Sequence, residues 1–388
     1  MQAITGVIQD YPWGSVDGIP GVLGTAVTDR PQAEYWLGAH AKAPAGLAEG
    51  DLAGYLEAHP AEIGRISVER FGGRLPFLLK VLSAKQALSL QAHPSRAQAI
   101  EGYARENAAG VPLDAPNRNY RDDWPKPEAM VALTEFHGLC GFREPAETRA
   151  LFAKLGVREA DQLMEPLTDP DGIARVFLEV LGLADQEGEL VAAVVAAAEA
   201  YAAEDSDFGR FCRTAVELNA DYPNDAGILA ALMLNRITLQ PGEAFFMPAG
   251  NLHAYLRGTG IEIMSNSDNV LRGGLTGKHI DIDELARVVD FAPGFPGVVT
   301  PVDEGNGIRR YPTEAPEFAL WELLDCADAE LPAAGRGRIL LVTDGTATLR
   351  RGSEMLEVPR GGAAFIGATE TGVRVDGPTR GFLAAGGV

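Results

Sequence analysis

The chain has 388 residues, which exceeds one ordinary domain of about 100–200 residues and suits two or three. Its 46% hydrophobic and 22% charged residues exclude disordered, collagen-like and disulfide-scaffold proteins. The 54 acidic against 33 basic residues give a net charge of −21, which repels nucleic acid and anionic membranes. We therefore expect neither as a partner, and an anionic small substrate requires a local basic cluster.

Along the chain, the pattern of apolar, Gly and Pro residues changes three times. Short apolar stretches separated by Gly and Pro, such as RLPFLLKVLSA and ALSLQAH, predict strands within residues 1–143. Apolar residues at three- and four-residue steps predict several helices within 144–234. Strand patterns return over 235–298, and short strands with turn signals fill 299–388.

We therefore expect a mainly β protein with an α-helical insertion. Residues 1–143 and 235–298 are expected to form one β-domain from two segments, with residues 144–234 inserted as a helical domain. Residues 299–388 are expected to form a second β-domain. No histidine lies between residues 280 and 388, so we expect this last domain to be structural.

The three cysteines, Cys140, Cys212 and Cys326, are odd in number and widely spaced, which favours reduced thiols. The amino-terminal residues show no signal-peptide pattern. The most apolar run, Leu190 to Ala198, is too short to cross a bilayer, which takes about 20 residues. A cytoplasmic protein is expected, and we predict a monomer.

A candidate metal site is built from residues far apart in the sequence. Gln91 and His93 are two residues apart, so on a regular strand they share one face, and Pro94 ends that strand. Glu128 follows a proline in WPKPEAM, and His253 lies beyond the helical block. Strand-borne ligands of this kind converge inside a barrel.

The residues before His253 carry a recognisable spacing. Gly242, Pro248, Gly250 and His253 match the cupin pattern of Gly, five residues, Pro, one residue, Gly, two residues and His. The cupin is a small jelly roll whose interior can hold a metal ion. Most metal cupins have a His-x-His pair where this chain has Gln91 and His93.

The segments YPWGS, AEYWLGAH, PFLLKVLSAKQALSLQAHP, KPEAM and EIMSNSDNVLRGGLTGKHID, in this order, resemble type I mannose-6-phosphate isomerases, which are zinc cupins with a helical insertion. The resemblance spans Tyr11 to His279. It implies one zinc ion per chain, held by Gln91, His93, Glu128 and His253. It also implies the interconversion of mannose 6-phosphate and fructose 6-phosphate, and the last β-domain would be a degenerate cupin.

Such an isomerisation needs a base near two adjacent carbons and stabilisation of an enediolate. Lys126 lies two residues before Glu128, and Glu262 is a carboxylate inside an apolar strand; either suits proton transfer. Glu262 is equally explained as a buried partner of Arg272 or Lys126. The sequence does not choose the base.

The resemblance places Asp268 and Arg272 at the mouth of the site, where Arg272 would stabilise the enediolate or orient the substrate and Asp268 would assist ring opening. Many relatives have a His before the Lys of the KPE motif. This chain has Pro125 there, so that ring-opening role does not carry over.

The phosphate of the substrate needs the basic cluster. Lys80, Ser89, Arg272 and Lys278 match family positions near the phosphate or the substrate. Trp13 is expected to line the mouth, although an aromatic side chain in such a segment also suits a core. Two other functions stay open: an iron cupin oxygenase, and a metal-binding sugar-recognition cupin without catalysis.

Overall fold

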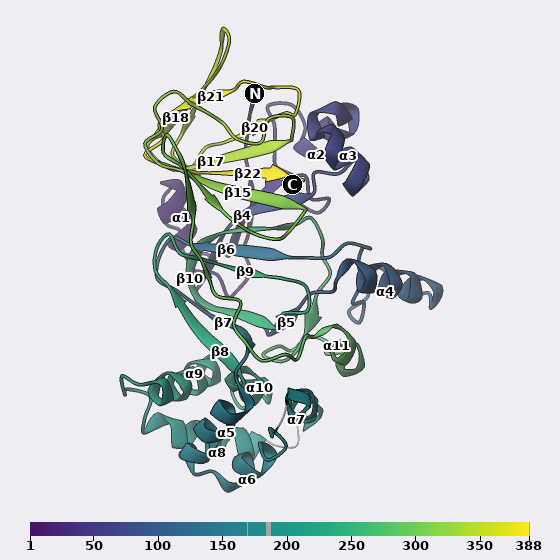
Figure 1. Cartoon of the computed structure of the whole chain (residues 1–388), viewed down its shortest axis with the longest axis vertical. Helices are drawn as coiled ribbons and strands as arrows, with labels where there is room; N and C mark the ends of the chain where they lie inside the picture. Colours follow the sequence, from purple (N-terminus) through teal and green to yellow (C-terminus); the bar gives the residue numbers. More distant parts are fainter. Residues whose placement is uncertain (169, 184–187, 388) are drawn as a thin grey trace.

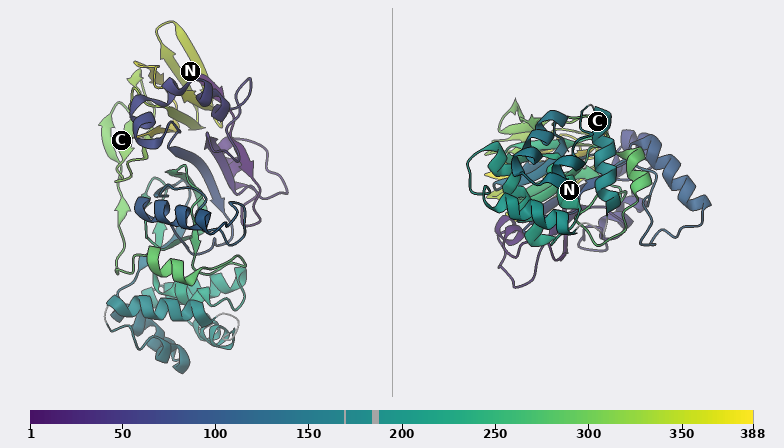
Figure 2. Two further views of the ribbon diagram at one scale, coloured as in Figure 1. Left: turned by 90° about the vertical axis from the view of Figure 1, so that its right-hand side faces the viewer. Right: turned by 90° about the horizontal axis from the view of Figure 1, so that it is seen from below.

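The computed structural model describes residues 1–168, 170–183 and 188–387. The molecule is elongated, with three parts stacked along its long axis (Figures 1 and 2). A helical block lies at one end, a β-barrel-like body in the middle and a second β-rich part at the other end, where both chain termini lie. This architecture is the predicted fold class, mainly β with an α-helical insertion.

The middle part is an 11-stranded antiparallel sheet in the described chain. Its central path runs β12-β9-β6-β10-β4-β3-β2, while β5, β7, β8 and β11 join at its side. The strands are β2 (Val7–Gln9), β3 (Glu34–Gly38), β4 (Phe77–Ala84), β5 (Gln91–Ala92), β6 (Glu128–Ala132), β7 (Phe136–Phe142), β8 (Leu234–Leu239), β9 (Ala244–Met247), β10 (His253–Ser265), β11 (Leu271–Arg272) and β12 (Val298–Val299).

The stretch ALSLQAH differs from its prediction. Only Gln91–Ala92 is a strand, because β5 pairs for so short a length with β10 on one side and β11 on the other.

Strand β4 is buried along its whole length, and β10 is buried except at Arg257 and Gly258. Leu79 and Val81 pack outward against the terminal β-part, whereas Leu82 and Ala84 pack inside the middle part. Lys80 lies on the inward face of this otherwise apolar strand. A charged side chain in such a place must be paired, and its partners define the site described below.

The terminal β-part has two sheets. A 7-stranded sheet runs β1-β20-β17-β22-β15-β14-β13, and a 4-stranded sheet runs β16-β21-β18-β19. The strands are β1 (Gln2–Ile4), β13 (Val302–Gly305), β14 (Ile308–Tyr311), β15 (Phe318–Leu323), β16 (Ala329–Glu330), β17 (Arg338–Asp344), β18 (Thr346–Arg351), β19 (Glu354–Pro359), β20 (Ala363–Ile366), β21 (Arg374–Asp376) and β22 (Arg380–Gly386).

The amino terminus belongs to this sheet, since β1 pairs with β20. Near the opposite boundary, β12 pairs with β9 of the middle sheet. The division of the chain at residues 143, 234 and 298 stays a prediction.

The helical block is inserted between β7 and β8, which pair with each other. Its core joins apolar residues of several helices, among them Phe152, Phe177 and Phe211. The helices of the chain are α1 (Gly18–Leu23), α2 (Leu52–Ala58), the 3-10 helix η1 (Pro60–Ile63), α3 (Arg65–Phe71), α4 (Arg96–Ala108), α5 (Pro145–Leu155), α6 (Arg158–Leu163), α7 (Pro170–Leu183), α8 (Gly188–Glu199), α9 (Asp207–Asp221), α10 (Gly227–Leu232) and α11 (Ile282–Val288).

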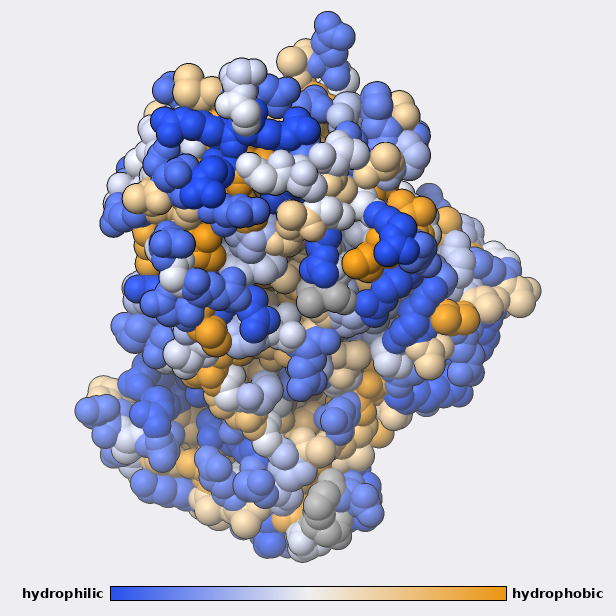
Figure 3. Space-filling view, turned by 45° about the horizontal axis from the view of Figure 1, so that its top comes forward, coloured by the Kyte–Doolittle hydropathy of each residue, from blue (hydrophilic) through white to orange (hydrophobic). Residues whose placement is uncertain are grey.

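Within the described residues, no helix combines the length and hydrophobicity that a membrane span requires. The face seen in Figure 3 is largely hydrophilic, with hydrophobic residues in small separate groups. The three cysteines are buried and free.

Candidate functional site

Strand register places the first group of site residues in one row. On β11, β5 and β10, Arg272 lies opposite Gln91, and Gln91 lies opposite His253. Directly opposed residues of antiparallel strands project to the same face. The short strand β5 thus presents Gln91 between a cation and an imidazole.

Three buried ligand atoms converge beside this row. The nearest potential ligand atoms of His93, Glu128 and His253 all lie within 4.8 Å of one another. Glu128 offers one carboxylate oxygen to each ring, with Nε2 of His93 at 3.5 Å and Nε2 of His253 at 3.2 Å. This is the only such group of His, Cys, Asp and Glu side chains among the described residues.

The hydrogen bonds of the two histidines fix their tautomers. Nδ1 of His93 donates to the carbonyl oxygen of Asn269 at 2.7 Å, and Nδ1 of His253 donates to that of Asn251 at 3.1 Å. Since a carbonyl only accepts, Nδ1 carries the proton in both rings. The Nε2 atoms of both rings face Glu128, an arrangement that suits the binding of a metal ion.

The charges around these atoms also favour a cation. Burial lowers the pKa of His93 to about 4, so its ring is neutral at ordinary pH. Burial opposes the charge of Glu128, but Lys126 and the two histidines outweigh it and hold its pKa well below the usual range. Two imidazoles, a carboxylate and the adjacent amide of Gln91 form a donor set that fits Zn²⁺.

Lys126 lies where the extended segment predicted it, on the same side as Glu128. Its ammonium contacts Oε1 of Glu128 and lies 3.5 Å from Nε2 of His93. The ammonium group of Lys126 therefore lies beside the group of His93, Glu128 and His253.

A second buried cluster surrounds Lys80. Its ammonium pairs with Glu262 at 2.8 Å and with Glu34 at 3.3 Å. The hydroxyl of Tyr255 donates to the other oxygen of Glu262 at 2.8 Å, and the indole of Trp36 donates to Glu34 at 2.8 Å. The partner of Glu262 is thus Lys80, and neither Arg272 nor Lys126, the two partners that the sequence suggested.

The pKa values of Lys80 and Glu262 are shifted by different neighbours. Burial raises the pKa of Glu262, and Glu128 and Glu34 add to that rise, although Lys80 opposes it. The pKa of Lys80 is raised: burial alone would lower it, but Glu262 and Glu34 outweigh that effect. Lys80 therefore stays protonated, and Glu262 is a more basic carboxylate than an ordinary one.

One cavity connects the ligand group with this cluster. It is lined by Glu34, Lys80, Leu82, Leu88, Ser89, Gln91, Lys126, Glu128, His253, Ala254, Tyr255 and Glu262. Ser89 accepts a hydrogen bond from the Gln91 amide at 3.4 Å. The predicted Gln91, Lys80, Ser89, Lys126 and Glu262 thus line one space together with Glu128 and His253.

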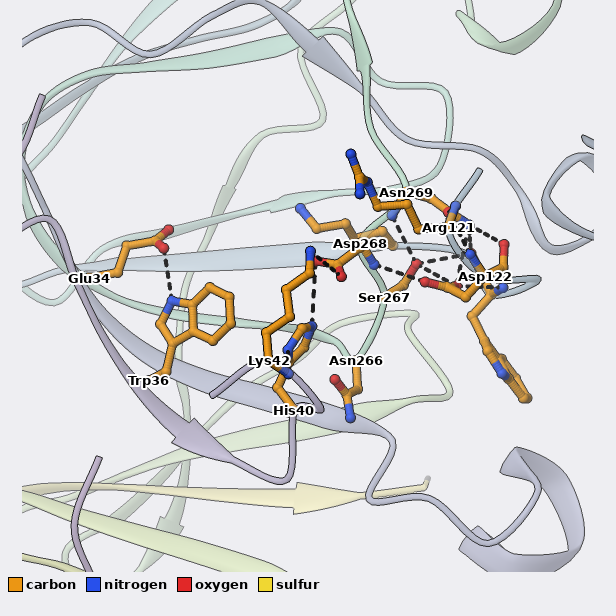
Figure 4. Close-up of polar contacts among 12 residues, drawn as sticks. Glu34, Trp36, His40, Lys42, Arg121, Asp122, Asn266, Ser267, Asp268 and Asn269 are labelled. Carbon is orange, nitrogen blue, oxygen red and sulfur yellow. Dashed lines mark hydrogen bonds and ion pairs between the residues drawn. The ribbon is translucent and has the colours of Figure 1, made fainter. Parts of the chain in front are cut away.

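At the mouth, Asp268 is held by residues that follow β3. Lys42 pairs with Asp268 at 2.8 Å, and Nε2 of His40 donates to its other oxygen at 3.4 Å (Figure 4). The ring of His40 packs against Trp36 with its centroid 4.9 Å away. Although burial opposes it, the contacts with His40 and Lys42 hold the pKa of Asp268 well below its usual range.

A group of cations lies nearby without acidic partners. Burial and Arg121 lower the pKa of Arg272, and burial, Arg272 and Arg121 lower the pKa of Lys278. No carboxylate of the described chain forms an ion pair with any of the three. Cations held together without carboxylates form a site for an anion.

The loop carrying these cations packs closely on the helical block. Gly274 has φ of 121°, and a Cβ atom there would lie 2.6 Å from Cα of Gly227 in α10. Only glycine tolerates both the angle and the approach.

Trp13 packs beside Leu88 against the inner core and stacks on Tyr11, with ring centroids 5.8 Å apart. It therefore borders the cavity through Leu88 and contributes to the core as well. Trp13 is not among the residues that line the cavity, so its place at the mouth stays a prediction.

The sequence analysis did not single out Glu34, His40, Lys42 or Arg121. A signal for part of this group existed: Glu34 and Trp36 are two residues apart on β3 and so share one face, whereas Lys42 lies in a turn after that strand. Arg121 lies in an irregular polar loop, where no periodicity marks it.

Comparison with known proteins shows the family to which the chain belongs. Residues 1–145 match the family model "phosphomannose isomerase type I, catalytic domain". The chain is 37% identical over 391 residues to mannose-6-phosphate isomerase of Escherichia coli strain K12, covering 98% of both proteins. It is 30% identical to the human mannose-6-phosphate isomerase, covering 94% of this chain and 92% of the relative.

A solved structure agrees over the whole length. The crystal structure of Salmonella typhimurium mannose 6-phosphate isomerase, bound to fructose 6-phosphate and zinc, superposes with a TM-score of 0.89 at 34% sequence identity. It covers 100% of each chain. Together with the paired histidines and the carboxylate between them, these similarities show that the chain belongs to the type I mannose-6-phosphate isomerase family.

Proposed function

We propose that this protein is a zinc-dependent isomerase that interconverts D-mannose 6-phosphate and D-fructose 6-phosphate. The observation that carries the proposal is the group of His93, Glu128 and His253, with both Nε2 atoms facing Glu128 and Gln91 alongside. Its relatives and a structure with bound fructose 6-phosphate and zinc support the same reaction.

Each group of the site has a place in this reaction. Gln91, His93, Glu128 and His253 would hold the ion, and bound zinc supplies a Lewis acid that stabilises negative charge on oxygens next to it. Arg121, Arg272 and Lys278 bind the phosphate, because they lie close together and none of them forms an ion pair with a carboxylate of the described chain. Ser89 and Trp13 border the sugar.

The proton transfers fall to residues that are not ligands. Glu262, whose pKa is raised by burial, takes the proton from C2 and returns it to C1. Lys80 holds Glu262 in place and keeps its ammonium as a counter-charge. Lys126 moves the second proton between the two substrate oxygens, and Asp268, held by His40 and Lys42, assists the opening of the sugar ring. Of the two places expected for Lys80, near the phosphate or near the substrate, this proposal uses the second.

We also propose that the enzyme acts as a monomer in the cytoplasm. The three buried, free thiols suit a reducing compartment.

A coupled assay with mannose 6-phosphate tests the function. Chelation should abolish turnover and zinc should restore it, while iron with oxygen consumption would instead indicate the oxygenase alternative. His93→Ala should lose both metal and activity, whereas the exposed His59→Ala should keep both. Turnover in a verified metal-free sample would contradict the proposal, and zinc binding without turnover would indicate the sugar-recognition alternative.

A further inference from the structure

Two loops at the mouth hold each other through a reciprocal pair of side chains, which we call the clasp: Asp122 and Asn269. The side chain of Asn269 binds the backbone of residues 121–124, and the side chain of Asp122 binds the backbone of the loop 267–269 (Figure 4). These loops are about 150 residues apart in sequence, so neither local turn chemistry nor a sheet ladder holds them together.

Asn269 is fully buried, and its amide uses all its hydrogen-bonding capacity toward the other loop. Its oxygen accepts from the backbone N–H of Arg121 at 2.7 Å and of Asp122 at 3.2 Å. Its nitrogen donates to the carbonyl oxygens of Asp122 and Trp124, both at 2.8 Å. An amide so occupied has one orientation available to it.

Asp122 returns these contacts. Its carboxylate accepts from the backbone N–H of Asp268 at 2.9 Å, from the hydroxyl of Ser267 at 2.8 Å and from the backbone N–H of Trp124 at 2.9 Å. The clasp is therefore a closed hydrogen-bond network, and such networks act as a unit.

The clasp touches three functional groups of the site. The carbonyl oxygen of Asn269 accepts the Nδ1 proton of His93, the ring whose Nε2 faces Glu128. Asp268 precedes Asn269, and its N–H is held by Asp122. The backbone N–H of Arg121 donates to the side-chain oxygen of Asn269. A shift of the clasp would therefore move the metal ligand His93, the acid–base group Asp268 and the phosphate-binding cation Arg121 together.

We propose that Asn269 is the positioning residue that couples the phosphate-binding cations to the metal ligand His93 through the clasp. The inference deepens the proposed function and rests on its metal site. The side chain of Asn269 is not proposed to contact the ion or the sugar, because its hydrogen bonds all go to residues 121–124.

The test compares two variants of the same loop. In Asn269→Ala the backbone groups of residues 121–124 lose their partners, so we expect the zinc dissociation constant, measured by chelator competition, to rise about 10- to 100-fold. Asn266→Ala is the matched control, because the Asn266 amide bonds only to the carbonyl oxygen of Leu75, at 3.3 Å. It should bind zinc as the unchanged protein does.

Kinetics separate positioning from general damage. At saturating zinc, Asn269→Ala should raise KM for mannose 6-phosphate about tenfold while kcat falls less, since Glu262 and Lys80 stand on other strands. Asp122→Ala combined with Asn269→Ala should weaken zinc binding no more than the stronger single change, because the two act as one unit.

The outcomes are distinct. Zinc affinity of Asn269→Ala within twofold of the Asn266→Ala control would overturn the clasp, even with an active parent enzyme. An inactive parent enzyme would instead overturn the proposed function, and the zinc measurements would still decide the clasp. If Asn269→Ala does not fold, Ser267→Ala, which removes one hydroxyl from Asp122, replaces it, and unchanged zinc binding would again contradict the proposal.

Discussion

His93 is a residue whose surroundings decide its chemistry before any metal binds. The ring is almost completely buried, with Nδ1 bonded to a carbonyl oxygen and Nε2 turned to Glu128. Its low pKa keeps it neutral and ready to coordinate over a wider pH range than a free imidazole.

This pKa predicts how the metal-free protein responds to acid. The unfolded chain takes up a proton at His93 near pH 6.5, whereas the folded protein does so only near pH 4. Acidification from pH 7 to 5 therefore favours unfolding and should cost the metal-free protein about 2 kcal/mol at this residue.

Urea unfolding at pH 7 and pH 5 measures the loss. His93→Gln provides the comparison, since it removes the titrating ring and should show a smaller pH dependence. An equal dependence in both proteins would rule out His93 as the cause.

At the scale of elements, cross-strand rows explain much of the site. Register puts Trp36 opposite Lys80 and Lys80 opposite Glu262, just as it puts Gln91 opposite His253. A one-residue slip of β10 would turn Glu262 and His253 away from the cavity, so the hydrophobic residues between them also fix the catalytic geometry.

The helical block contributes stability and is separate from the ligand group. Helix α9 begins with Ser206, whose hydroxyl accepts from the backbone N–H of Gly209 at 2.9 Å. Ser206→Ala should lower the free energy of unfolding by about 1 kcal/mol and leave KM unchanged. Ser206→Asp keeps the cap and should restore the stability.

Chemical denaturation and steady-state kinetics on the same samples check this prediction. A changed KM would show that the helical block affects the sugar site, and undiminished stability would show that the cap contributes nothing.

The elements show what the sequence could and could not foretell. The fold class was predictable from the periodicity of apolar residues along the chain. The convergence of His93, Glu128 and His253 was predictable from strand spacing and from the resemblance to a known family. The partner of Glu262 did not, because it depends on the register of β4 against β10. Arg121 was equally hidden, since its place depends on the clasp between two distant loops.

At the scale of the whole molecule, the net charge opposes the proposed substrate. An enzyme with a charge of −21 repels a sugar phosphate, and the group of Arg121, Arg272 and Lys278 offsets this locally. The repulsion acts over longer distances than the attraction. Salt shortens that reach, from about 30 Å at 0.01 M to about 8 Å at 0.15 M ionic strength.

We therefore expect kcat/KM for mannose 6-phosphate to rise between 0.01 and 0.15 M salt, because distant acidic residues are screened before the adjacent cations are. Initial rates at constant pH and zinc concentration provide the measurement. Arg121→Ala should have a lower kcat/KM at every salt concentration and a steeper rise. A steady fall with salt in the unchanged protein would mean that the local cations dominate even at long range.

The order of the ligands along the chain has a consequence for biosynthesis. Gln91, His93 and Glu128 leave the ribosome early, but His253 follows only after the whole helical block. A nascent chain that ends before β10 lacks both the last imidazole and the strand against which β4 and β6 pair. The proposed set of four zinc ligands is thus complete only after about two thirds of the polypeptide has been made.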